Sequence, residues 1–123
     1  MAERLESTKE NIDKMAKEIY NFLAANGMWY DTTITFNGKT MTTSLANGEW
    51  GDGKQFQVLE NEAEQRDGFI LSMTFEGPLH QCLNYNYEIS YCDKISNGLA
   101  GIFNKYGCYY ELGHSYDLEA YRI

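Results

Sequence analysis

Asn37-Gly38 separates two runs of residues in which apolar side chains recur at every second position. Asn and Gly tolerate the positive φ angles that a two-residue hairpin turn requires. The run Met28–Phe36 alternates as a half-buried strand does. A turn at Asn37-Gly38 places apolar residues of both strands on one face, so turn and pattern together predict an antiparallel hairpin. The predicted apolar pairs are Ile34 with Met41 and Tyr30 with Leu45, with Trp29 on the opposite face.

An amphipathic helix is predicted over Ser7–Gly27. Its apolar residues recur every three or four positions, which places them on one side of a helix with 3.6 residues per turn. Ser7 and Glu10 have the spacing of a capping box at the start of this helix. Gly27 suits the end because it adopts the left-handed conformation without a clash. The apolar positions are Leu5, Ile12, Met15, Ala16, Ile19, Phe22 and Leu23.

The rest of the chain is predicted to be mostly strand. A short helical turn is expected from Pro78, and a second helix over about Cys92–Tyr106, where Gly98 and Gly101 each lower the helix propensity by roughly 1 kcal/mol. Strands following strands, with helices before and near the end, predict an α+β fold. We expect one domain, residues 1–123, whose antiparallel sheet of about five to seven strands is covered on one face by the N-terminal helix and the second helix. The further strands are expected over Phe56–Leu59, Gly68–Glu76, Leu83–Tyr91, Cys108–Leu112 and Tyr116–Arg122.

Composition restricts the partners and the compartment of this protein. The net charge of −8 disfavours direct binding to nucleic acid or anionic lipid and favours a basic protein surface. No apolar run approaches the roughly 20 residues of a membrane span, so a cytoplasmic protein is expected. Three dispersed cysteines predict reduced, buried thiols and neither a disulfide framework nor a metal knuckle. No cofactor or metal is expected.

The segment Ala46–Lys54 is rich in glycine and carries most of a phosphate-binding loop pattern, from Gly48 to Lys54. The pattern needs a Ser or Thr after the lysine and then a helix, whereas Gln55 and a strand-like run follow here. Glu49 and Asp52 would also repel a phosphate. A hairpin loop is therefore the preferred interpretation, with Trp50 either folded back or available to a partner.

The segment Glu60–Asp67 is the most acidic part of the chain. Its alternating carboxylates could form a weak calcium site, but the liganding order and the glycine of a dedicated calcium loop are missing. A solvated loop or a surface for a partner's basic groove are the other interpretations. The predicted partner-binding residues are Glu60, Glu62, Glu64, Asp67, Glu49, Trp50 and Asp52.

Candidates for catalysis are few. His80 and Cys82 are two residues apart and point in different directions on a helical turn. His114 has Glu111 and Asp117 nearby, a spacing that allows a carboxylate-oriented imidazole or one weak metal position. Two dispersed histidines cannot build a three-histidine zinc site. A small-ligand pocket near His114, Tyr110 and Tyr116 remains an alternative to a purely protein-binding function.

Two stretches, Met73–Leu79 and Lys105–Tyr116, resemble segments of small uncharacterised acidic proteins of Gram-positive mobile elements. Small acidic proteins of such elements include inhibitors of host defence of the anti-CRISPR and anti-restriction types. The resemblance implies a non-enzymatic inhibitor that occupies the basic groove of a nucleic-acid-processing defence enzyme, and it carries over no functional residue. A third hypothesis is a module that self-associates as a homodimer through a sheet edge or through Trp29 and Trp50.

Overall fold

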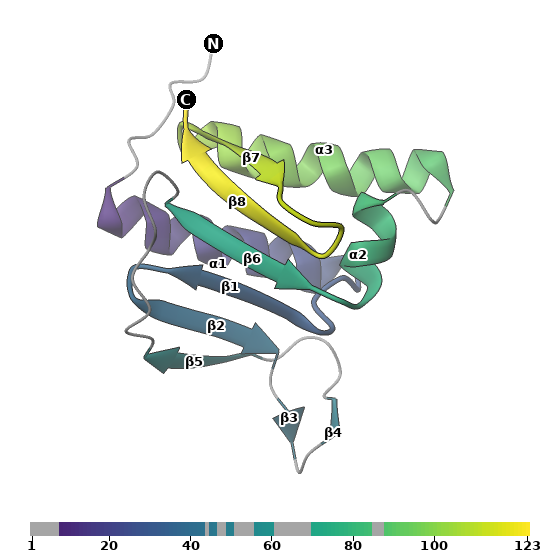
Figure 1. The fold of residues 1–123 in the computed structure, drawn as a ribbon, viewed down its shortest axis with the longest axis horizontal. Helices are drawn as coiled ribbons and strands as arrows, with labels where there is room; N and C mark the ends of the chain where they lie inside the picture. Colours follow the sequence, from purple (N-terminus) through teal and green to yellow (C-terminus); the bar gives the residue numbers. More distant parts are fainter. Residues whose placement is uncertain (1–7, 44, 47–48, 51–55, 61–69, 85–87) are drawn as a thin grey trace.

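The computed structural model describes residues 8–43, 45–46, 49–50, 56–60, 70–84 and 88–123 (Figure 1). The six main strands form one antiparallel sheet in the order β5-β2-β1-β6-β8-β7, and β3 and β4 pair separately. This arrangement confirms the predicted α+β class and falls within the predicted number of strands. The elements are α1 (Lys9–Ala25), β1 (Thr32–Phe36), β2 (Lys39–Thr43), β3 (Leu45–Ala46), β4 (Glu49–Trp50), β5 (Phe56–Glu60), β6 (Leu71–Phe75), α2 (Pro78–Leu83), α3 (Ile89–Lys105), β7 (Cys108–Leu112) and β8 (Asp117–Arg122).

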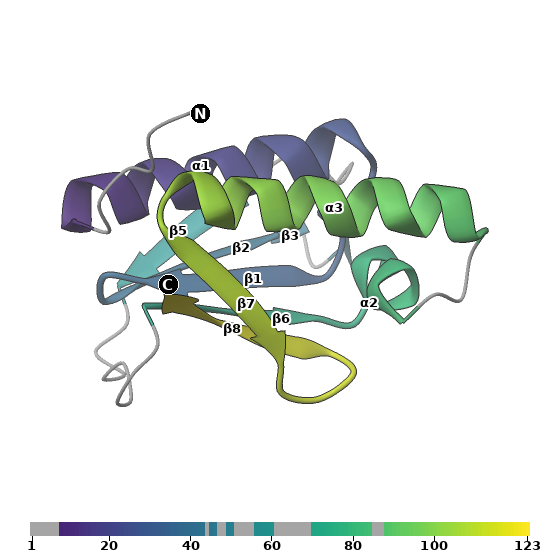
Figure 2. The same cartoon turned by 90° about the horizontal axis from the view of Figure 1, so that it is seen from above.

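Helices α1 and α3 lie side by side along one face of the sheet (Figure 2). The start of α1 is held to the β1–β2 hairpin, because Asn37 Nδ2 donates to the Lys9 carbonyl oxygen and to Asp13 Oδ1, both at 2.8 Å. Lys39 Nζ also lies 3.5 Å from Asp13 Oδ1. No helix in the described ranges is long and apolar enough to cross a membrane. Helices and sheet enclose the core, whose fully buried members include Met15, Ile19, Leu23, Trp29, Ile34, Leu71, Phe75, Ile95, Leu99, Phe103 and Leu118.

The first helix begins one residue later than predicted. Thr8 is the N-cap, and its Oγ1 accepts from the Asn11 amide at 3.2 Å. Ser7, the predicted cap, and Leu5 lie outside the described residues. Ser and Thr are nearly equivalent as caps, so local chemistry could not choose between adjacent positions. The predicted end at Gly27 is confirmed, because Gly27 has a φ of +70°.

The predicted hairpin has the right turn and register but starts too early. Asn37 and Gly38 have φ angles of +49° and +74°, and Ile34 pairs with Met41 as predicted. The strand begins at Thr32 rather than Met28, because Asp31 adopts a φ of +54° that interrupts the extended chain. The Tyr30–Leu45 pair and the opposite-face position of Trp29 were therefore wrong. Trp29 is fully buried and packs edge-on against Tyr20, so it cannot offer its ring to a second copy.

The strand predicted over Leu83–Tyr91 was also wrong. Leu83 ends α2, and α3 begins at Ile89, three residues before its predicted start. The alternation of tyrosines crosses the boundary between two helices, so its period of two does not describe one element. Tyr91 lies on α3, where its hydroxyl donates to the Asn26 carbonyl oxygen at 3.0 Å. Tyr85 and Tyr87 lie outside the described residues.

Other predicted elements are confirmed with small changes at their ends. Strands β5, β6, β7 and β8 and the helix beginning at Pro78 match their predictions. Part of the glycine-rich segment predicted as a loop instead forms a short ladder, in which Leu45 pairs with Trp50 and Ala46 pairs with Glu49.

The two glycines of α3 have different surroundings, which gives a stability prediction. A Cβ at Gly101 meets no atom within 4 Å, whereas a Cβ at Gly98 would collide with the Phe22 ring of α1. We expect Gly101→Ala to raise the free energy of unfolding by about 1 kcal/mol through helix propensity. Gly98→Ala should gain less or destabilise, because α1 and α3 approach closely there.

Urea unfolding followed by circular dichroism measures both changes. Equal stabilisation by the two substitutions would contradict the close approach of α1 and α3 at Gly98.

Candidate protein-binding surface

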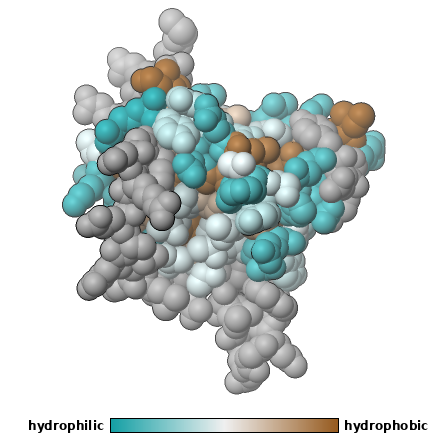
Figure 3. All heavy atoms as spheres, viewed as in Figure 1, coloured by the Kyte–Doolittle hydropathy of each residue, from teal (hydrophilic) through white to brown (hydrophobic). Residues whose placement is uncertain are grey.

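The face of the sheet away from the helices is polar. Along each strand, side chains alternate between the buried core and this open face, so Ile34 is buried while Thr33 and Thr35 are only partly covered. Thr33 and Thr42 hydroxyls lie 3.2 Å apart across the hairpin. The open face is turned toward the viewer in Figures 1 and 3 and is largely hydrophilic. Its described members on β1, β2 and β6 are Thr33, Thr35, Thr40, Thr42, Ser72 and Thr74.

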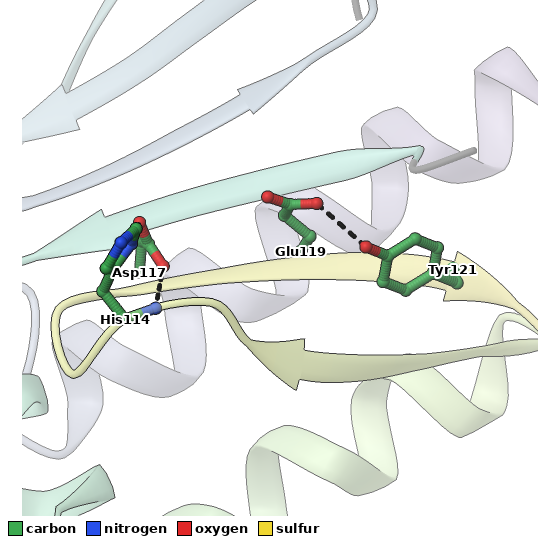
Figure 4. A network of polar contacts seen from close by, with 4 residues as sticks. All are labelled: His114, Asp117, Glu119 and Tyr121. Carbon is green, nitrogen blue, oxygen red and sulfur yellow. Dashed lines mark hydrogen bonds and ion pairs between the residues drawn. The ribbon is translucent and has the colours of Figure 1, made fainter. Parts of the chain in front are cut away.

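At the β7–β8 hairpin this open face becomes acidic and aromatic. Glu111 lies directly opposite Glu119 in the strand register, and Tyr109 lies opposite Tyr121. The two tyrosine rings stack with centroids 5.7 Å apart. Tyr121 donates from its hydroxyl to Glu119 Oε2 at 2.9 Å (Figure 4). We call Tyr109, Glu111, Glu119 and Tyr121 the hairpin surface.

Like charges opposite each other weaken a strand pair, so the Glu111–Glu119 pair contributes nothing favourable to the sheet itself. The hydrogen bond from Tyr121 to Glu119 raises the pKa of the Tyr121 phenol, with smaller contributions from burial and from the charges of both glutamates. The phenol therefore stays protonated and can donate to Glu119. A surface of this kind offers acceptors and negative charge together with flat aromatic rings.

The turn that joins β7 to β8 is ordered by Asp117. The His114 amide donates to Asp117 Oδ1 at 2.6 Å, and His114 Nδ1 lies 3.0 Å from Asp117 Oδ2 (Figure 4). Burial alone would raise the pKa of Asp117, but the side-chain and backbone hydrogen bonds from His114 outweigh it and hold the pKa below its ordinary value. The His114 ring stacks on Tyr116, 5.5 Å between centroids. Asn84 Nδ2 donates to the Ser115 carbonyl oxygen at 2.7 Å, which ties the turn to α2.

The predicted pocket near His114 is only partly assembled. His114, Tyr116 and Asp117 come together, as the carboxylate-oriented imidazole requires. Tyr110 does not join them, because its hydroxyl lies 3.4 Å from Ser96 Oγ and its ring packs on Phe103 of α3. Among the described residues, no three His, Cys, Asp or Glu side chains are grouped closely enough to hold a metal ion.

The predicted partner-binding residues are placed only in part. Glu49 and Trp50 form β4, and Glu60 ends β5 opposite Lys39 of β2. Asp52, Glu62, Glu64 and Asp67 lie outside the described residues. Sequence reasoning missed Glu111 and Glu119 as a pair, although both occupy the polar side of the two C-terminal strands that it predicted. The alternation of polar and apolar residues in each strand indicated that both glutamates lie on the polar side. It could not show that they lie opposite each other, because that depends on the register between the two strands.

The thiols are buried and free, as predicted for Cys82, Cys92 and Cys108. Burial raises the pKa of Cys82 to about 11, and the neighbouring Cys92 contributes to the rise. The Cys82 thiol is therefore protonated at neutral pH and is a poor nucleophile. His80 lies on α2 with Cys82, two residues away along the helix.

A groove of about 310 Å³ lies between the start of α1 and the β1–β2 hairpin. Most of its charged groups are matched, because Lys14 pairs with Glu10 at 3.7 Å and Lys39 with Asp13 at 3.5 Å. Lys17 also lines the groove and takes no part in these two pairs. The groove therefore has less unmatched charge than the hairpin surface. Its lining residues are Glu10, Asp13, Lys14, Lys17, Phe36, Lys39 and Met41.

No protein family, curated protein or solved structure gives a match to this chain. The two stretches that carry the resemblance to acidic mobile-element proteins lie in defined elements here. Met73–Leu79 covers the end of β6 and the start of α2, and Lys105–Tyr116 covers β7 and the turn after it. The second stretch thus includes half of the hairpin surface, and the functional implication of the resemblance stays a prediction.

Proposed function

We propose that this protein is a non-enzymatic binding module that docks its acidic surface on a basic groove of another protein. The target is a nucleic-acid-processing defence enzyme in the cytoplasm, which the bound module keeps from its DNA or RNA. The observation that carries the proposal is the hairpin surface, where Glu111 and Glu119 face each other beside two stacked tyrosines. A groove that recognises phosphates presents lysines and arginines, and a row of carboxylates competes for those cations.

Charge supports this assignment at two levels. The whole chain carries −8, which steers it toward cationic surfaces and away from nucleic acid. On the open face of the six main strands, the charged side chains described on β7 and β8 are Glu111, Asp117 and Glu119. The electrostatic potential of the hairpin surface is therefore negative, as is that of the whole protein.

The aromatic residues supply the second ingredient of a protein interface. Tyrosine is enriched at binding hot spots because its ring buries a large area and its hydroxyl still makes a hydrogen bond. Tyr109 is 41% exposed, and its ring stacks on Tyr121 beside the paired glutamates, so this aromatic surface is available to a partner. Charge gives fast association, and ring burial then slows dissociation.

Neutralising the hairpin carboxylates should weaken binding without unfolding the protein. We expect Glu111→Gln with Glu119→Gln to slow association with the target about tenfold at low salt, because steering depends on charge. The amide oxygen introduced at position 119 can still accept from Tyr121, so the fold is retained. Asp117 is left unchanged because it orders the turn. The matched control is Glu10→Gln with Asp93→Asn, which changes the net charge equally on the helical side and should stay within about twofold.

Tagged wild-type protein, the Glu111→Gln/Glu119→Gln variant and the control variant are first used to capture partners from a bacterial lysate. The bacterium carries RNA-guided and restriction nucleases. Each capture is done with and without excess duplex DNA. The partner is then purified, and its association rate and nuclease activity are measured. A partner displaced by DNA, inhibited by the wild type and bound slowly by the hairpin variant supports the proposal. A partner bound equally by all variants, or one that binds DNA and the module together, contradicts it.

A third variant compares the two acidic regions. Glu60→Gln, Glu62→Gln and Glu64→Gln together neutralise the segment that the sequence pointed to. If this variant alone slows association, the binding class stands, but its location on the hairpin surface is wrong.

A further inference from the structure

We propose that the free edge of β7 receives an extended, basic segment of the partner as an additional antiparallel strand. This inference rests on the proposed function and specifies how the partner is held. Strand addition at a sheet edge combines main-chain hydrogen bonds with alternating side-chain contacts.

The register of the β7–β8 hairpin determines which main-chain groups point outward. Gly113 N donates to Asp117 O at 3.2 Å, and Ile123 N donates to Gly107 O at 3.0 Å. In an antiparallel ladder, hydrogen-bonded pairs alternate with non-bonded pairs. The odd-numbered residues of β7 therefore direct their main-chain groups toward β8.

The even-numbered residues Tyr110 and Leu112 direct their N–H and C=O groups away from β8. β7 is the last strand in the order of the sheet, so among the described strands none lies on that side. In Figure 2 the edge of β7 faces the viewer, with β8 and β6 behind it and α3 to one side. An unpaired edge of this kind is a template for another strand.

Most of the exposed apolar side chains belong to the same hairpin. The described residues include six large hydrophobic side chains that are exposed, and four of them belong to the β7–β8 hairpin or the residue that follows it. Leu112, at the edge itself, is 44% exposed. An added strand would cover part of this area. The four residues are Tyr109, Leu112, Tyr116 and Ile123.

The two sides of β7 specify the side chains of the occupant. In an added antiparallel strand, the residues opposite Tyr110 and Leu112 direct their main-chain N–H and C=O groups toward β7. Their side chains point to the α3 side of the sheet, where Leu112 favours an apolar contact. Residues opposite Tyr109 and Glu111 place their side chains on the open face, beside the two glutamates. The segment is therefore expected to alternate apolar and basic residues. A second copy of this chain fits less well, because each copy carries −8.

The test uses a synthetic peptide, acetyl-Lys-Val-Lys-Val-Lys-Val-Lys-amide, and the full-length protein labelled with ¹⁵N. In the proposed geometry the valine amides face β7 and the lysine amides face solvent. N-methylation of the valines should weaken binding about tenfold, because it removes donors and adds bulk at the edge, whereas N-methylation of the lysines should change it less than about twofold. Chemical-shift titration gives the affinities. The Tyr110 and Leu112 amides should also gain protection from hydrogen exchange in the complex.

The outcomes separate this inference from the proposed function. Equal effects of the two methylated peptides, or a stronger effect of lysine methylation, overturn antiparallel pairing at β7. If binding then still depends on Glu111 and Glu119, the basic-partner proposal stands without the added strand. A peptide with Thr in place of Lys that binds equally well and keeps the methylation pattern supports edge pairing and contradicts the basic partner. Protection of Tyr110 and Leu112 without peptide, in a sample that dimerises, would overturn the inference in favour of self-association.

Discussion

Replacing Trp29 with alanine is expected to lower the free energy of unfolding by about 3–5 kcal/mol, the range for removing a large buried aromatic side chain. Trp29 is fully buried and lies edge-on to Tyr20 of α1, with ring centroids 5.0 Å apart. It follows the end of α1 and precedes β1, so its ring anchors the link between helix and sheet. A domain of this size is stable by only about 5–15 kcal/mol, so the loss is a large fraction of the total.

Urea unfolding followed by far-ultraviolet circular dichroism measures this effect. The midpoint should fall by about 2 M, given the usual dependence on denaturant for a small domain. Ile89→Ala is the control, because Ile89 is 68% exposed, and it should change the stability by less than about 0.5 kcal/mol. An unchanged midpoint for Trp29→Ala would mean that Trp29 is not in the core.

Tyr106→Phe is expected to reduce the decrease in the free energy of unfolding that occurs as the pH rises above 10. Tyr106 is 3% exposed, and its hydroxyl donates to Glu18 Oε1 at 2.8 Å, beside Lys105 Nζ at 2.6 Å from the same oxygen. Burial and the negative Glu18 raise the pKa of Tyr106 from 10.0 to about 12. Below pH 10 the phenol is protonated in both folded and unfolded chains. Between pH 10 and pH 12 only the unfolded chain releases the proton, so the folded state loses about 2–3 kcal/mol.

The variant has no phenol at position 106 to ionise, so its free energy of unfolding should not fall by this amount between pH 10 and pH 12. At pH 7 it should be about 1 kcal/mol less stable than the wild type, because the hydrogen bond to Glu18 is lost. Free energies of unfolding measured from pH 9 to pH 12 give the comparison. Tyr109→Phe is the matched control, because Tyr109 is an exposed tyrosine outside this contact, and it should follow the wild type. Parallel curves for Tyr106→Phe and wild type would show that Tyr106 does not hold a raised pKa in the folded state.

Local sequence patterns predicted only some of the contacts at the candidate site. The sequence placed Glu111 and Glu119 on predicted strands, and it placed His114 near Asp117, a contact of 3.0 Å in the structure. It grouped Tyr110 with His114, whereas the strand directs Tyr110 toward Ser96 on α3. Neighbours in a turn are close because the chain connects them. Contacts between elements depend on the direction in which each strand faces the helices.

Much of the secondary structure followed from the sequence by itself, because its signals are local. The Asn37-Gly38 turn, the pairing of Ile34 with Met41 and the left-handed Gly27 each depend on a few adjacent residues and their allowed backbone angles. Tertiary structure decided the features that depend on distant partners. It placed Trp29 in the core, started α3 within an apparent strand pattern, and set β7 at the edge of the sheet with Glu111 opposite Glu119. Burial and strand order arise from packing between segments far apart in the chain, which a periodic pattern within one segment does not encode.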